Sequence, residues 1–145
     1  MNQPHATYQE IDINTSNPMK LVLMLYDGAI NFLRKATEYG EKKDIKNKNI
    51  YANKARDIIL ELNNSLNLEA GGEIAHYLRG LYLFMNRHLM QANWNNDIKG
   101  ITEVIQLLSN LREGWQEVYK QTAATQNPVY DRIETQFYQQ RGFRI

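Results

Sequence analysis

The sequence predicts an all-α protein, an antiparallel up-and-down four-helix bundle with an N-terminal strap and a short C-terminal tail. Four segments repeat apolar residues at the three- and four-residue spacing of a helix that is buried on one face. Each segment is about 20–24 residues long, or roughly 30–36 Å at the α-helical rise. The connections between them are short, which favours antiparallel neighbours, and no strand-like alternation of apolar and polar residues competes.

The first helix is expected from Pro18 to about Gly40. Asn17 stands before Pro18, and a side-chain acceptor followed by proline is typical of a helix start, because the acceptor caps free amides and proline has none. Gly40 stands where a helix would end. The core-facing residues predicted for this helix are Leu21, Leu25, Phe32, Ala36 and Tyr39, with Met24, Ala29 and Leu33 beside them.

The second helix is expected from near Asp44 to about Asn67, where Gly71 and Gly72 then break the pattern. Its predicted core-facing residues are Tyr51, Ala55, Ile58, Ile59, Leu62 and Leu66.

The third helix is expected from about Gly72 to Asn95, and the fourth from Ile98 to roughly Gln121. The predicted core-facing residues of the third are Ile74, Leu78, Leu81, Met85, Leu89 and Ala92. Those of the fourth are Ile98, Ile101, Ile105, Leu108, Leu111, Trp115 and Val118. The mid-helix residues expected to be buried, one from each helix, are Leu25, Leu62, Met85 and Leu108.

The chain of 145 residues is expected to form one domain, residues 1–124, which includes an N-terminal strap at 1–17. The strap is polar except for Tyr8, Ile11 and Ile13. The tail, residues 125–145, carries a brief helical pattern that is too short to be stable by itself in water.

Composition excludes several classes of partner and compartment. The formal net charge of +1 is too balanced for a protein whose main partner is nucleic acid or an anionic membrane. The longest apolar run, Leu21 to Tyr26, is far shorter than the ~20 residues of a membrane span. The first ten residues lack the basic start and apolar stretch of a signal peptide, so a cytoplasmic protein is expected.

The residues do not predict an enzyme, a cofactor or a metal. Glu73 and His76 have the Glu-x-x-His spacing of ferritin-like metal sites, but neither other histidine, His5 or His88, follows a glutamate in this way. A metal-binding bundle is therefore a disfavoured alternative. The basic stretch from Lys42 to Lys48 is interrupted by Asp44 and is expected to be a solvated face rather than a docking patch.

The apolar residues exceed what a four-helix core needs, which is about three positions in seven. The surplus on the first helix is Val22, Leu23, Tyr26, Ile30 and Leu33, and on the fourth helix it is Val104 and Leu107. A wider core, a dimer face or a groove for a partner helix would each account for it.

Four ordered blocks of the sequence, within about residues 8–120, resemble the FliS family of flagellar secretion chaperones. Residues 15–30 read Thr-Ser-Asn-Pro and then Leu-Val-Leu-Met-Leu-Tyr-Asp-Gly-Ala-Ile after two further residues, similar to the opening of these proteins, with Asn17 in place of the usual serine. Residues 55–62 resemble the second helix of the family, and residues 83–93 its Tyr-Met-x-Arg-Arg-Leu-x-x-Ala-Asn segment. Residues 103–115, from Glu-Val to Trp, are similar to its fourth helix.

This resemblance implies a chaperone that holds the disordered C-terminal region of flagellin, blocks its premature polymerisation and delivers it to a component of the flagellar export gate. It also implies a groove that the chaperone's own N-terminal segment covers when empty. The residues expected to bind flagellin or cover the groove are Tyr8, Ile11, Ile13, Tyr51, Ile58, Val104, Leu107 and Leu108. The alternative is a structural bundle that forms a weak homodimer and has no flagellin client.

Overall fold

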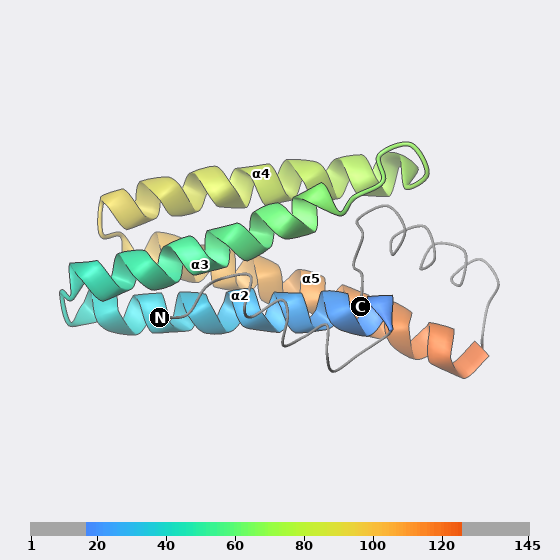
Figure 1. Cartoon of the computed structure of the whole chain (residues 1–145), viewed down its shortest axis with the longest axis horizontal. Coiled ribbons are helices and arrows are strands. Elements are labelled where there is room, and N and C mark those ends of the chain that lie inside the picture. The colour runs from blue at the N-terminus through green and yellow to red at the C-terminus, as the bar shows by residue number, and fades with distance from the viewer. Residues whose placement is uncertain (1–16, 126–145) are drawn as a thin grey trace.

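The computed structural model describes residues 17–125 of the chain, and their side chains as far as Gln121. These residues form helices α2 (Pro18–Glu41), α3 (Ile45–Asn64), α4 (Gly72–Trp94) and α5 (Ile98–Thr125), joined by short turns (Figure 1). The prediction of an all-α four-helix bundle is confirmed. The second helix ends three residues earlier than expected, and the fourth continues to Thr125.

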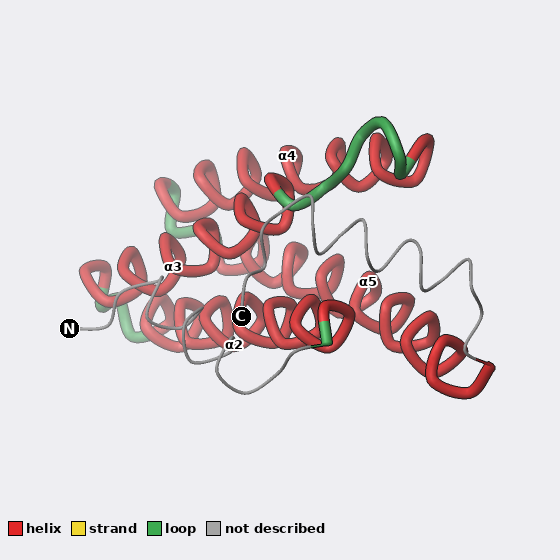
Figure 2. The backbone as a smooth tube through the Cα atoms, turned by 45° about the vertical axis from the view of Figure 1, so that its right-hand side comes forward, coloured by secondary structure: helices red, strands yellow, loops and turns green. Residues whose placement is uncertain are grey.

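The four helices form a closed ring in which α3 and α5 each pack against both α2 and α4. The α2/α3 side of the bundle is therefore opposite the α4/α5 side. The C-terminal end of α5 and the N-terminal end of α4 diverge at one end of the bundle (Figures 1 and 2). At the other end, the α2–α3 and α4–α5 turns lie close together, because Gly40 approaches Ile98 and Lys48 contacts Asn93.

Side-chain caps fix three of the helix starts. The Oδ1 atom of Asn17 accepts from the backbone amides of Met19 at 3.0 Å and Lys20 at 3.2 Å, which is the cap expected before Pro18. Asp44 Oδ1 accepts from the amide of Asn47 at 3.2 Å. Asp97 Oδ1 accepts from the amide of Gly100 at 3.0 Å. Local residue types therefore determine where these helices begin.

The core confirms the four mid-helix predictions, because Leu25, Leu62, Met85 and Leu108 are at most 1% exposed. The surplus apolar residues of α2 are buried as well: Val22, Leu23, Tyr26, Ile30 and Leu33. On α2 the surplus therefore widens the core.

The predicted core face of α4 is wrong at its N-terminal end. Ile74 is 71% exposed, whereas Ala75 and Tyr82 are buried. The face predicted from Leu78 to Ala92 is otherwise buried, apart from the partly buried Leu81. Ile74 is in the first turn of α4, at the end where the backbones of α4 and α5 diverge, and its side chain is exposed there. No helix between residues 17 and 125 has the length and apolar character needed to cross a membrane.

Candidate functional site: an apolar face on α4 and α5

The exposed large apolar side chains of the described residues gather on α4. They are Ile74 (71%), Tyr77 (66%), Phe84 (42%), Met90 (47%) and Trp94 (89%), together with Ile45 and Ile50 of α3. Exposed apolar side chains that cluster on one element mark an interaction surface more often than isolated ones do. The candidate site therefore lies on α4 and its neighbours.

Three of these exposed residues, Ile74, Tyr77 and Phe84, form one row with the partly buried Leu81, and we call this row the α4 stripe. Their spacing of three, four and three residues places them on the same side of the helix. Leu81 is partly buried against the core, and the other three are exposed. The row covers about 15 Å of helix, counted as ten residues at the α-helical rise.

The α4 stripe faces the boundary with α5. His88, one turn beyond Phe84, pairs with Glu103 of α5, with 2.9 Å between Nε2 and Oε1. The Phe84 ring stacks on His88 at a centroid distance of 5.3 Å. Leu107 and Leu111 follow Glu103 by one and two turns, on the same side of α5, and both pack partly buried against the core. The α4 stripe and these two leucines together define the α4/α5 face.

A buried polar network lies beneath this face. The hydroxyl groups of Tyr26 and Tyr82 hydrogen-bond to each other, and Trp115 Nε1 donates to the Tyr26 hydroxyl at 3.0 Å. Burial raises the pKa of Tyr26 to about 12 and that of Tyr82 well above its usual value. Both phenols are therefore protonated at neutral pH and act as fixed links among α2, α4 and α5.

An ion pair holds the C-terminal half of α5 against α2. The Nε and Nη2 atoms of Arg112 contact the two carboxylate oxygens of Asp27, the second at 3.2 Å. Hydrogen bonding to Asp27 raises the pKa of Arg112. The pair and the Trp115 hydrogen bond fix which side of α5 is turned towards α4. The apolar side chains of α5 are thereby held at the α4/α5 face.

A second aromatic cluster lies on the opposite side of the bundle, between α2 and α3. Tyr51 stacks on Tyr39 with ring centroids 5.6 Å apart and lies 5.9 Å from Phe32. The ammonium of Lys54 is over both the Tyr51 ring, at 5.2 Å, and the Phe32 ring, at 5.5 Å. These contacts between cations and ring faces stabilise the pairing of α2 with α3.

The site residues predicted from the sequence do not lie together in the structure. Tyr51 is partly buried on the α2/α3 side, whereas Leu107 is partly buried on the α4/α5 face. Ile58, Val104 and Leu108 are fully buried in the core and offer no accessible side chain. Tyr8, Ile11 and Ile13 lie outside the described residues.

Sequence reasoning missed Tyr77 and Phe84, and it assigned Ile74 to the core. The sequence does contain the pattern of this row, because Ile74, Tyr77, Leu81 and Phe84 follow one another at three- and four-residue spacing. That row lies beside the core row on the same helix, so α4 carries two apolar rows. Only contacts between helices show which of the two is covered.

The residues considered for a metal do not form a cluster. Glu73 and His76 are both exposed on the first turns of α4. Within residues 17–125, no three side chains of histidine, cysteine, aspartate or glutamate are grouped closely enough to hold a metal ion.

Comparison with known proteins adds to this geometry. The sequence model of the family described as "Flagellar protein FliS" matches residues 1–122. The flagellar secretion chaperone FliS of Campylobacter jejuni is 34% identical over 125 residues, which are 86% of this chain and 98% of that protein. The protein of the same name from Bacillus subtilis is 36% identical, over 81% of this chain and 86% of its own length. That of Salmonella typhimurium is 41% identical, over 75% of this chain and 82% of its own length.

Proposed function

Because the chain belongs to the FliS family of flagellar secretion chaperones, we propose that it binds the disordered C-terminal region of flagellin in the cytoplasm. It thereby prevents premature polymerisation and assists delivery of flagellin to the flagellar type III export apparatus. The family consists of chaperones and not of enzymes. A chaperone of this class needs a surface that accepts an unfolded segment of its client.

The observation that carries this proposal is the α4/α5 face. Its α4 stripe has the three- and four-residue spacing with which an amphipathic client helix would present its own apolar side chains. A client segment that folds on binding loses conformational entropy, so it needs a long apolar contact to offset that loss. Tyr77 and Phe84 offer exposed aromatic surface, the residue class that dominates binding energy at interfaces.

The residues predicted from the sequence to bind the client have different roles in this proposal. Leu107 contacts the client at the α4/α5 face, while Val104 and Leu108 support it from the core beneath. Tyr51 is a second contact on the α2/α3 side, with Ile58 beneath it in the core. Tyr8, Ile11 and Ile13 cover client-binding surface in the empty chaperone and are displaced by flagellin.

Calorimetry with a peptide of the flagellin C-terminal region tests the proposal. Binding should have a large negative heat-capacity change, because apolar surface leaves water. Tyr77→Ala and Phe84→Ala should each weaken binding by about tenfold, the effect of losing an aromatic interface anchor. Both side chains are exposed, so neither substitution should unfold the bundle.

Trp94→Ala is the matched control, because Trp94 is exposed on α4 but does not belong to the α4 stripe. It should leave the affinity for the flagellin peptide unchanged. Absence of binding at high micromolar peptide would reject the client. If size-exclusion chromatography showed a dimer that Tyr77→Ala converts to a monomer, with no effect of flagellin, the homodimer alternative would hold instead.

A further inference from the structure

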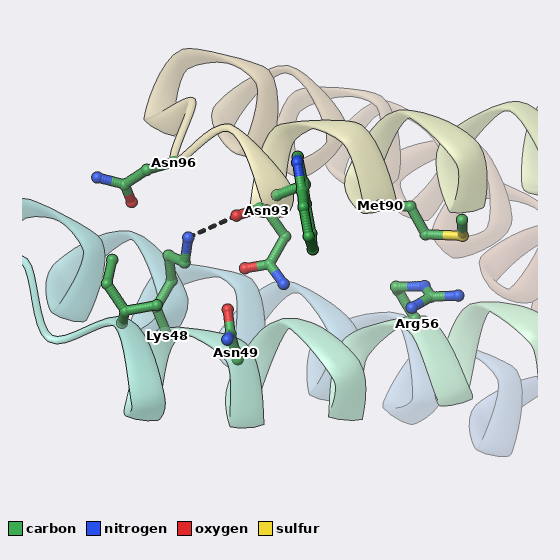
Figure 3. Close-up of a pocket in the computed structure, with 8 residues that line it drawn as sticks. Lys48, Asn49, Arg56, Met90, Asn93 and Asn96 are labelled. Atoms are coloured by element: carbon green, nitrogen blue, oxygen red, sulfur yellow. Dashed lines mark hydrogen bonds between the residues drawn. The ribbon is translucent and has the colours of Figure 1, made fainter.

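A pocket of about 520 Å³ lies between α3 and α4, away from the α4 stripe (Figure 3). It is at the end of the bundle where the α2–α3 and α4–α5 turns meet. Its lining includes Lys48 and Arg56 of α3, Met90, Asn93 and Trp94 of α4, and Asn96 of the following turn. Its volume is within the range of sites that bind small ligands or peptide side chains.

The floor of the pocket holds a buried cation. Lys48 is 1% exposed, and its Nζ donates to the backbone carbonyl of Asn93 at 2.6 Å (Figure 3). This bond satisfies one of the carbonyls at the end of α4. Burial lowers the pKa of Lys48. An ammonium group has three N–H donors, and one of them is used by a hydrogen bond to the described residues.

Two buried acceptors beside the pocket have no partner among the described residues. The side-chain oxygens of Asn93 and Asn96 are buried and receive no hydrogen bond from the described part of the chain. Neither oxygen has accessible surface, and that of Asn96 lies against Gly40, so a docked peptide does not contact them.

At the mouth of the pocket, the guanidinium of Arg56 lies near the exposed apolar side chains of Met90 and Trp94. Trp94 is 89% exposed and Met90 is 47% exposed. Arg56 is held in place by two hydrogen bonds, from Nε to Asn86 Oδ1 at 2.9 Å and from Nη1 to Asn53 Oδ1 at 3.2 Å. Tryptophan, methionine and arginine are the residue types enriched at protein interfaces. A guanidinium held in position loses less entropy when it binds a carboxylate.

The charge of this end of the bundle is positive. The basic residues near the pocket are Lys42, Lys43, Lys46, Lys48, Arg56 and Lys99. The acids at the same end are Glu41, Asp44, Asp57 and Asp97, so the bases outnumber them six to four. Asp44 and Asp97 are engaged as helix caps with Asn47 and Gly100. The surface potential therefore attracts an acidic partner.

We propose that this pocket is a second docking site, separate from the client-binding face, for an acidic peptide segment of a partner protein. A carboxylate of that segment pairs with Arg56, and an adjacent apolar side chain packs between Met90 and Trp94.

The C-terminal segment of this chain does not fit this description. The segment at 126–145 has three arginines and two acids, so it has the wrong charge. Two copies joined through this pocket would bring like charges together.

The test uses the full-length chain labelled with ¹⁵N and the peptide acetyl-Glu-Asp-Leu-Phe-Asp-Glu-amide. One control peptide replaces the four acids with lysine, and a second replaces Leu-Phe with Ser-Ser. The acidic, apolar peptide should give saturable shifts of the Trp94 indole N–H and the Asn93 side-chain amide. Each control peptide should bind at least about tenfold more weakly, because it lacks either the charge-assisted bond or the apolar contact.

Matched variants make the test specific. Arg56→Gln and Trp94→Ala should each weaken peptide binding by about tenfold, while Lys20→Gln and Tyr77→Ala should not change it. Neither Arg56→Gln nor Trp94→Ala should change flagellin binding, so this proposal can fail while the proposed function stands.

Three results would overturn the proposal. The first is no saturable shift at about 1 mM peptide, the weak end of measurable affinity. The second is equal binding of the acidic and lysine peptides. The third is a concentration-dependent shift of the Trp94 indole without peptide, which would identify a second copy of the chain as the occupant.

Discussion

The Tyr26 hydroxyl of α2 hydrogen-bonds to the Tyr82 hydroxyl of α4 through the centre of the bundle, although these helices are diagonal to each other in the ring. Trp115 of α5 donates to the same Tyr26 oxygen at 3.0 Å, so three of the four helices meet at one atom. Polar atoms are tolerated in a core when they are paired. This network fixes the relative rotation of α2, α4 and α5 and hence the side of each that faces outward.

The first prediction concerns alkaline pH. The pKa of Tyr26 is raised from 10.0 to about 12 by burial, so between these values the folded chain keeps a proton that the unfolded chain loses. The free energy of unfolding should therefore fall as pH rises from 10 to 12. Each proton contributes a slope of about 1.4 kcal/mol per pH unit. Urea unfolding at several pH values measures it.

Tyr82→Phe should reduce this slope relative to the unaltered protein, because the pKa of Tyr82 is also raised by burial. The lowered pKa of Lys48 acts in the opposite direction, but it is present in both proteins and cancels in the difference. Tyr77→Phe, at an exposed position, is the control and should leave the slope unchanged. Equal slopes in the Tyr82→Phe and unaltered proteins would contradict the prediction.

The second prediction concerns the core. Leu62→Ala and Met85→Ala should each lower the free energy of unfolding by roughly 2–5 kcal/mol, because both side chains are fully enclosed. Ile74→Ala should change it by less than about 0.5 kcal/mol, because that side chain is 71% exposed. Chemical denaturation measures all three. A large loss of unfolding free energy in Ile74→Ala would mean that the Ile74 side chain is buried in the core.

The third prediction compares two glycines of α5. A Cβ at Gly100 would lie 2.8 Å from the Cβ of Ala92, so Gly100→Ala should destabilise the α4–α5 contact by about 1–3 kcal/mol. A Cβ at Gly114 meets no atom within 4 Å, so Gly114→Ala should stabilise the helix by up to about 1 kcal/mol. Thermal unfolding should show opposite signs, and the same sign at both positions would count against this helix packing.

The fourth prediction concerns the ion pair between Asp27 and Arg112. Their side chains are 46% and 32% exposed, so the coupling should be only about 0.5–1 kcal/mol despite two contacts. A double-mutant cycle with Asp27→Asn and Arg112→Gln measures this coupling, which should weaken in high salt. A coupling of several kcal/mol, insensitive to salt, would mean that the pair is shielded from solvent.

The fifth prediction concerns the segment that contains Tyr8, Ile11 and Ile13, which lies outside the described residues. Backbone amides from Tyr8 to Ile13 should exchange slowly in the free chaperone and faster once flagellin is bound. Hydrogen exchange with and without the flagellin peptide measures this change. Deletion of residues 1–14 should change the affinity only modestly, because three partly covered side chains contribute little after ordering entropy is subtracted. Equal protection in both states would rule out displacement.

Sequence patterns located the site only in part. Leu107 was named from the surplus on the fourth helix and does lie on the α4/α5 face, but Ile58, Val104 and Leu108 were named with it and are in the core. One helix with two apolar rows is compatible with two rotations about its axis. The choice depends on the neighbouring helices, which single-sequence periodicity does not describe.

Local residue types specify the helices and their order along the chain. Asn17, Asp44 and Asp97 cap helices through atoms two or three residues away, and these short-range bonds can be read from residue types. The burial of Leu25 and Met85 can also be predicted from the sequence, because each is in the middle of an apolar row. Which of the surplus apolar side chains stay exposed depends on the packing of the helices against one another. Val22 and Tyr26 were enclosed by neighbouring helices, whereas Ile74 and Tyr77 stayed exposed where α5 diverges from α4, since burial depends on atoms distant in the chain.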